Sequence, residues 1–188
     1  MPRSGPVGVR LFVALELPAA VRRGLGGWVR GQRALRTTVR PVPEEQLHLT
    51  LAFLGERPAA EIEPLAGAVA LAGTDRSCLD LETGAPIWLP PRRPRALAIE
   101  VHDLRGDLAE LHRSLTDALA DAVGWRPDRR LRPHVTVGRR RPEAGPDPGA
   151  APDPTPDLRF DAPALALVRS TLRPSGAEHQ VLERVPLA

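Results

Sequence analysis

Two short apolar segments each carry a histidine and a threonine two residues apart, and this repeat is the strongest constraint on the fold. Residues 47–54 (LHLTLAFL) and 132–138 (RPHVTVG) alternate apolar and polar residues, which is typical of a β-strand with one buried face. The histidine and the threonine fall on the polar face each time, so the chain is expected to present the same pair twice. The four residues of this pattern are His48, Thr50, His134 and Thr136.

The segments that precede these two strands also share an order. Residues 9–17 (VRLFVALEL) and 96–101 (ALAIEV) favour buried strands, and each is followed by a helical pattern. Pro18 opens the first helix, and Asp103 is expected to cap the second. The apolar stripe expected on the second helix consists of Leu104, Leu108, Leu111, Leu115 and Leu119.

The spacing of these elements indicates an internal duplication. Ala14 lies 34 residues before His48, and Ala98 lies 36 residues before His134. We therefore expect one domain, residues 1–188, built from repeats of roughly 9–90 and 95–188. The predicted fold class is α+β, with two pseudo-symmetric lobes that each hold an antiparallel sheet with helices on its outer face. The active-site cleft would lie between the lobes.

A proline-rich segment interrupts the second repeat. Residues 142–156 (PEAGPDPGAAPDPTP) lack so many backbone donors that neither a helix nor a central strand can form there. The segment is expected to be a mobile loop, and a tolerated surface insertion is favoured over a functional lid.

Charge and cysteine content narrow the classes of function. All 26 basic residues are arginine, and against 23 acidic residues they leave a net charge of +3, too small for a nucleic-acid coat. The planar guanidinium group of arginine nevertheless donates hydrogen bonds in a geometry that suits phosphate oxygens. The single cysteine, Cys78, cannot form an internal disulfide, and no Cys/His cluster has zinc-ligand spacing. The expectation is a cytoplasmic protein with no metal, no cofactor and no membrane-spanning segment.

The two His-x-Thr pairs supply what phosphate chemistry requires. Residues two apart on a strand lie about 6.6 Å from each other, so both side chains can contact one small anion. Threonine donates a hydrogen bond to a non-bridging oxygen, and imidazole gives or takes a proton near neutral pH. Nine of the 188 residues are threonine, so chance would produce two such pairs only about 2% of the time. His102 and His179 lack a hydroxyl partner at this spacing and are expected to be structural.

The two segments resemble the signature motifs of the two-histidine phosphoesterase superfamily. Within it, the chain is most similar to bacterial RNA 2′,3′-cyclic phosphodiesterases, also named 2′-5′ RNA ligases. The resemblance extends beyond the motifs, because residues 10–14 (RLFVA), 91–95 (PRRPR) and 167–170 (LVRS) match the family as well. It therefore covers nearly the whole chain.

This resemblance implies a fold, a reaction and roles for individual residues. Both His-x-Thr strands would line a central cleft, where the enzyme hydrolyses 2′,3′-cyclic phosphodiester ends of RNA, or nucleoside 2′,3′-cyclic phosphates, to 2′-phosphomonoesters. His48 would donate the proton to the leaving ribose oxygen, and His134 would activate water. Thr50 and Thr136 would hold the non-bridging oxygens. The remaining residues it assigns are Phe12 and Arg139, which would sandwich a base.

Two alternatives remain open from the sequence. The same site could join a 2′,3′-cyclic end to a 5′-hydroxyl as a 2′-5′ RNA ligase, since both directions use one acid and one base. A non-catalytic module that binds RNA ends is the rival from another class. The presence of both histidines and both threonines argues against that module, because binding alone needs no acid–base pair. In the binding module the phosphate contacts would be Arg92, Arg93, Arg139, Arg140 and Arg141. Under each of these readings, the protein is expected to act as a monomer.

Overall fold

The computed structural model describes residues 8–76, 78–144, 151–174 and 176–187. Within these ranges the α-helices are α1 (Ala19–Gly31), α2 (Ile62–Gly73) and α3 (Asp107–Val123). Short 3₁₀ turns cover Arg33–Leu35, Glu44–Gln46 and Ala59–Glu61. The strands are β1 (Val9–Glu16), β2 (Val39–Pro41), β3 (His48–Arg57), β4 (Leu81–Leu89), β5 (Ala96–Asp103), β6 (His134–Arg140), β7 (Arg159–Phe160), β8 (Ala164–Arg173) and β9 (Gly176–Pro186).

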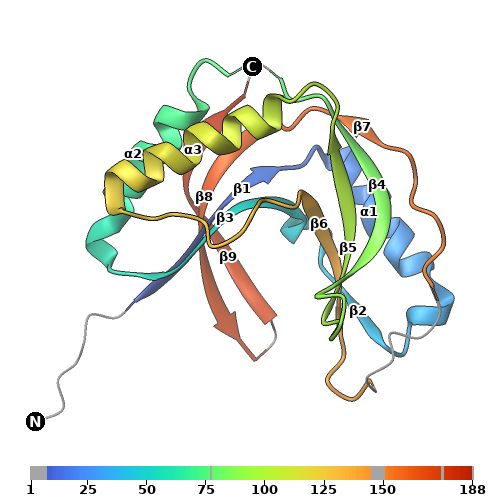
Figure 1. The fold of residues 1–188 in the computed structure, drawn as a ribbon. Coiled ribbons are helices and arrows are strands. Elements are labelled where there is room, and N and C mark those ends of the chain that lie inside the picture. The colour runs from blue at the N-terminus through green and yellow to red at the C-terminus, as the bar shows by residue number, and fades with distance from the viewer. Residues whose placement is uncertain (1–7, 77, 145–150, 175, 188) are drawn as a thin grey trace, which may run out of the picture.

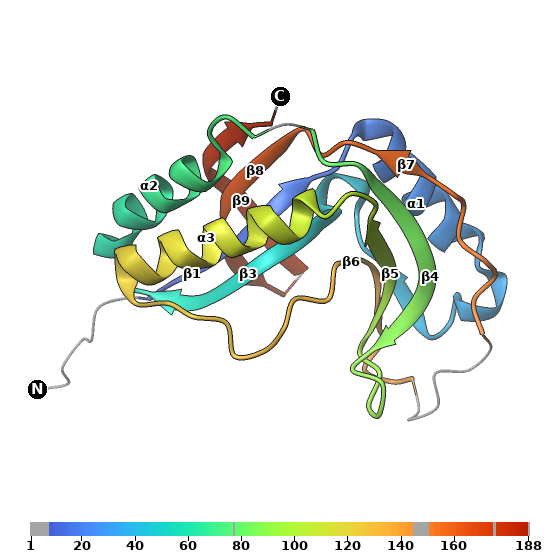
Figure 2. The same cartoon turned by 45° about the horizontal axis from the view of Figure 1, so that its top comes forward.

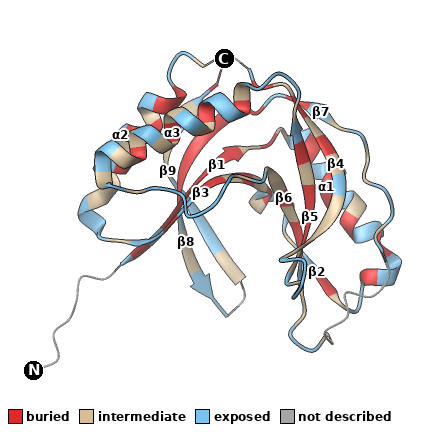
Figure 3. Ribbon diagram, viewed as in Figure 1, coloured by how far each residue is buried: buried red, intermediate tan, exposed pale blue. Residues whose placement is uncertain are grey.

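These strands form one antiparallel sheet that curves into an arch (Figure 1). Its order is β7-β4-β5-β6-β3-β1-β8-β9, with β2 paired to β6. The helices lie on the outer side of the arch, and the buried residues gather between them and the sheet (Figures 2 and 3). The predicted α+β class, with helices on the outer face of antiparallel strands, is confirmed.

The expected two sheets are joined into a single sheet. Strands β9, β8, β1 and β3 form one half of the arch, and β6, β5, β4 and β7 form the other. Within the described residues, the register between the two halves consists of one pair, Leu49 of β3 opposite Val135 of β6. Because β8 pairs with β1 and β4 pairs with β5, each half takes strands from both expected repeats, 9–90 and 95–188. The repeats are thus interleaved in space.

Helix α3 follows the predicted leucine stripe with one exception. Leu108, Leu111, Leu115 and Leu119 are at most 1% exposed, but Leu104 is 43% exposed because the helix begins only at Asp107. The N-cap residue is Gly106, three residues after the predicted Asp103, but the Asp103 carboxylate accepts hydrogen bonds from the backbone N–H groups of Gly106 and Ala109. Gly124 ends the helix with a positive φ of 69°.

Helix α1 carries glycines that are poor helix formers, and one of them has a clear packing reason. A Cβ on Gly26 would lie 2.5 Å from the Cγ of Glu44, so glycine lets α1 approach the turn that leads into β3. Glu44 in turn accepts a hydrogen bond from Arg30 of α1 at 2.6 Å. The chain entering β3 at His48 is therefore braced against α1.

The described part of the proline-rich segment has no helix or strand, as predicted, but hydrogen bonds attach it to the rest of the fold. The Trp28 indole N–H donates to the carbonyl of Pro154 at 2.9 Å, and the Gln32 side chain accepts from the N–H of Asp153 at 2.9 Å. The Thr83 hydroxyl donates to the carbonyl of Pro156 at 2.6 Å. Residues 151–156 are thus tied to α1 and β4, whereas residues 145–150 lie outside the described ranges.

Candidate active site

The pairing of β3 with β6, which connects the two halves of the sheet, brings the two His-x-Thr pairs together. Leu49 and Val135 face each other in antiparallel register and are fully buried. Their neighbours on the two strands point to the opposite, concave face, so that His48 lies toward Thr136 and Thr50 toward His134. All four side chains line one cavity of about 560 Å³. The register thus places one His-x-Thr pair on each side of the contact between Leu49 and Val135.

Both histidines are oriented in the same way by the backbone. Nδ1 of His48 lies 2.7 Å from the carbonyl oxygen of Gln46, and Nδ1 of His134 lies 2.7 Å from that of Arg132. A carbonyl oxygen only accepts hydrogen bonds, so each Nδ1 carries the hydrogen and each Nε2 is left to exchange a proton with a ligand. Arg132 is itself held by Glu100 of the neighbouring strand β5 at 2.7 Å.

Phe12 does not offer an open face to a base. It is 5% exposed, and its ring stacks on His48 with centroids 4.9 Å apart. With Ala14, Ala166 and Val168 it forms a small apolar cluster distinct from the main core. The stacking role expected for Phe12 is therefore corrected: it supports the His48 ring. The physical reason is its cross-strand position in β1, where β3 and β8 flank it on both sides.

Sequence reasoning missed several residues of the cavity, and two of them carry aromatic rings, Phe53 and His179. Phe53 lines it and is 66% exposed, because a β-bulge between β1 and β3 turns it to the same face as Thr50. His179 of β9, expected to be structural, contacts the edge of the His48 ring at a centroid distance of 5.4 Å. Its hydroxyl neighbour is Ser170, which lies opposite on β8. No spacing within one strand could reveal that cross-strand pair.

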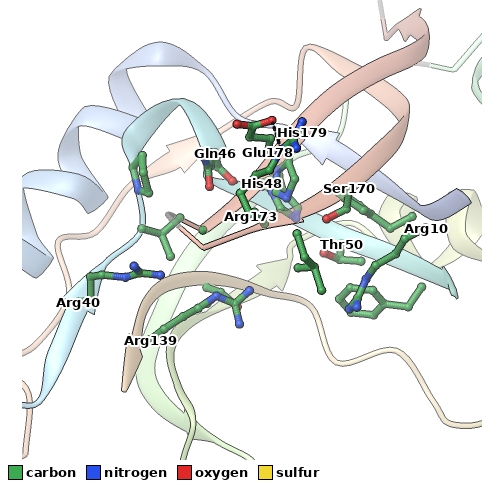
Figure 4. A pocket seen from close by; sticks show the side chains of 18 of the residues that line it. Arg10, Arg40, Gln46, His48, Thr50, Arg139, Ser170, Arg173, Glu178 and His179 are labelled. Atoms are coloured by element: carbon green, nitrogen blue, oxygen red, sulfur yellow. Dashed lines mark hydrogen bonds and ion pairs between the residues drawn. The ribbon is translucent and has the colours of Figure 1, made fainter. Parts of the chain in front are cut away.

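Arginines surround the cavity on several sides (Figure 4). Arg40 and Arg139 lie on the side of β2 and β6, whereas Arg10 lies near Ser170 and Thr50 on the other side. Arg139 lines the cavity and is exposed. An anion entering the cavity thus meets positive charge from more than one strand.

The position of His48 lowers the pKa of its imidazole from 6.5 to about 4. Burial is the main cause, since it disfavours the charged form; the carbonyl of Gln46 opposes it, and the positive charges of His179, Arg139 and His134 add to it. Burial also lowers the pKa of His179, with a smaller contribution from Arg139. These surroundings therefore favour a neutral imidazole at His48.

This shift predicts a specific loss of stability in acid. The folded-state pKa lies below that of the unfolded chain, so the unfolded chain binds more protons as the pH falls from 6.5 to about 4. The contribution is fully present above that window and is lost within it, with a magnitude of up to about 3 kcal/mol. Urea unfolding across this range should show a steeper decline for the native protein than for His48→Gln. Parallel declines would contradict the buried, neutral state of His48.

Other features of the described residues bear on ligands. No cluster of three His, Cys, Asp or Glu side chains in the described ranges is arranged to hold a metal ion. Cys78 is exposed and free. None of the helices described is long and apolar enough to cross a membrane.

A curved antiparallel sheet that brings two His-x-Thr strands into one cavity defines a two-histidine phosphoesterase. The model of the 2′-5′ RNA ligase superfamily matches residues 17–173. The chain belongs to this family.

Relatives and solved structures agree with that assignment. The RNA 2′,3′-cyclic phosphodiesterase of Thermus thermophilus is 35% identical, with 95% of this chain and 90% of the relative covered. The Escherichia coli protein of the same name is 33% identical over 72% of this chain and 74% of its own. The crystal structure of TT0787 from Thermus thermophilus has a TM-score of 0.79 at 31% identity and covers 95% of this chain and 97% of its own. Escherichia coli LigT complexed with 3′-AMP has a TM-score of 0.74 at 28% identity, covering 96% and 99%.

Proposed function

We propose that the protein hydrolyses 2′,3′-cyclic phosphodiester ends of RNA to 2′-phosphomonoesters. The observation that carries the proposal is the presence of two oriented imidazoles and two threonine hydroxyls in one cavity. The names of the relatives support the reaction, and LigT structures with 3′-AMP and with phosphate support a nucleotide phosphate as ligand of this fold.

The reaction needs an acid and a base at opposite ends of an in-line path. In our proposal, Nε2 of His134 takes a proton from water as the water oxygen bonds to phosphorus. The bond from phosphorus to the ribose 3′ oxygen breaks, and Nε2 of His48 protonates that oxygen. Thr50 and Thr136 donate hydrogen bonds to the non-bridging oxygens, where negative charge gathers as phosphorus becomes five-coordinate.

The low pKa of His48 has to be reconciled with its role as acid. The substrate phosphate carries one negative charge, and an opposite charge within a few ångströms favours the imidazolium form. Binding of the substrate therefore raises the pKa of His48 from the value of about 4 that burial produces. The bound substrate thus favours the protonated imidazolium form of His48, which is the form that acts as the acid.

The base of the terminal nucleotide is proposed to lie between Phe53 and Arg139. Both side chains are exposed and line the cavity, and an aromatic ring and a guanidinium plane both stack on bases. Phe12 has the supporting role described above. We also propose that the protein works as a monomer in the cytoplasm; the cavity is built within one chain, and Cys78 is a free thiol.

The test is an assay of the purified protein with a nucleoside 2′,3′-cyclic phosphate in excess EDTA. Two imidazoles and two hydroxyls supply proton transfer and charge stabilisation, so we expect hydrolysis at an undiminished rate and a 2′-phosphate as the only product isomer. Identification of the isomer by chromatography is essential. The proposal fails if no hydrolysis occurs, or if a divalent metal has to be added back.

A further inference from the structure

A second concave region lies beside the active-site cavity and is lined by arginine. It is a groove of about 600 Å³ formed by the β4–β5 loop and the chain that continues from β6. Figures 1 and 2 show this loop beside the end of β6, at the open rim of the arch. The side chains that line it are Arg92, Arg93, Pro94, Arg95, Arg140, Arg141, Pro142 and Ala144.

The groove is continuous with the cavity along the chain. Arg139 lines the cavity, and the next two residues, Arg140 and Arg141, line the groove. The loop is fixed to β6 by the N–H of Arg140, which donates to the carbonyl of Arg95 at 2.8 Å. Strand β6 runs from His134 to Arg140, about 20 Å at 3.3 Å per residue. A stacked nucleic-acid strand rises about 3.4 Å per nucleotide, so a chain that ends at His134 reaches the groove within about six nucleotides.

The charge of the groove is not neutralised by the residues that line it. Five of the eight lining residues are arginine and none is acidic. In the described part of the chain, no ion pair involves Arg92, Arg93 or Arg95. Nine arginines of the described ranges do pair with a carboxylate, for example Arg159 with Asp80 and Arg184 with Glu16. The guanidinium groups of Arg92, Arg93 and Arg95 on this concave surface therefore match phosphate oxygens.

We propose that this groove binds backbone phosphates of the RNA chain several nucleotides upstream of the cyclic end. The inference rests on the proposed function, and it makes an RNA chain, in preference to a mononucleotide, the substrate class. Contacts to phosphate carry no base sequence, so the groove adds affinity for any RNA long enough to reach it. A nucleoside cyclic phosphate fills only the cavity and gains nothing from the groove.

The experiment compares two substrates with two double variants. Arg92→Gln/Arg93→Gln removes two charges from the groove; Arg23→Gln/Arg113→Gln removes two exposed arginines from the outer helices α1 and α3, where no described side chain pairs with them. For an RNA of about ten nucleotides with a cyclic end, the groove variant should lose on the order of tenfold in kcat/KM at low salt. Its log–log salt dependence should become shallower by about 1.4, since each contact to a single strand contributes about 0.7. Its kcat/KM for a nucleoside 2′,3′-cyclic phosphate should equal that of the native protein, and the control variant should match the native protein on both substrates.

A binding measurement separates this inference from the proposed reaction. Fluorescence anisotropy with a labelled RNA of about ten nucleotides that ends in a 2′-phosphate needs no turnover, and the groove variant should bind it on the order of tenfold more weakly. Equal losses of RNA affinity in the groove and control variants would mean that only overall charge matters, and would contradict the phosphate-binding role of the groove. Unchanged affinity and unchanged salt dependence in the groove variant would overturn it as well. Absence of hydrolysis by the native protein, together with weakened binding by the groove variant, would reject the reaction and retain the groove.

Discussion

His48→Ala and His134→Ala are each expected to lower kcat for a nucleoside 2′,3′-cyclic phosphate by about 10²–10⁴-fold, the usual contribution of a positioned acid or base. Both side chains have Nδ1 fixed by a backbone carbonyl and leave Nε2 to act in the same cavity. Steady-state rates measured at several pH values would give the effect. Rates within a few-fold of the native value for both variants would refute the enzymatic role of the pair.

The double variant and a matched control make this expectation sharper. His48→Ala/His134→Ala should lose far less than the product of the two single losses, because removing one partner already stops a step that needs both. His102→Ala is the control, since His102 is an exposed histidine of β5 outside the cavity. It should retain native rates. All variants should first be compared by thermal unfolding, because His48 also packs on Phe12.

The elements that carry the site were predictable because they are local. Alternation along residues 47–54 and 132–138 marks a strand with one buried face, and β3 and β6 have Leu49 and Val135 buried where that pattern requires. The stripe of α3 is likewise set by residues three and four apart. Such patterns depend on neighbours in the sequence, so the sequence is sufficient to reveal them.

What could not be predicted depends on contacts between distant segments. The pairing of β1 with β8 and of β4 with β5 interleaves the expected repeats, and no residue pattern within a repeat reports it. His179 reaches His48 only because β9 pairs with β8 and β8 with β1. The bulge that exposes Phe53 while Phe12 stays buried is also a property of the pairing of β1 with β3. Neither ring's exposure can be read from alternation alone.

The assignment of acid and base depends on which imidazole is charged during the reaction, and the surroundings of His48 by themselves disfavour its role as the acid. Burial holds the pKa of His48 at about 4, which favours the neutral form that accepts a proton. The roles proposed above require the substrate anion to reverse this preference, whereas the opposite assignment does not. A substrate that needs no acid distinguishes the two possibilities.

That substrate is a nucleoside 2′,3′-cyclic phosphate in which sulfur replaces the 3′ oxygen. A thiol such as that of cysteine has a pKa of about 8.5, so the sulfur leaves as a thiolate without a proton while the ring geometry at phosphorus is kept. His48→Ala should therefore recover about 10²-fold or more of its loss on this substrate, because only the missing acid is bypassed. His134→Ala should stay inactive, since water still has to lose a proton as it attacks. Rates of thiol release, measured with a thiol reagent for both variants and for His102→Ala, decide the matter. Recovery of His134→Ala in place of His48→Ala would show that His134 is the acid and that the neutral imidazole of His48 is the base.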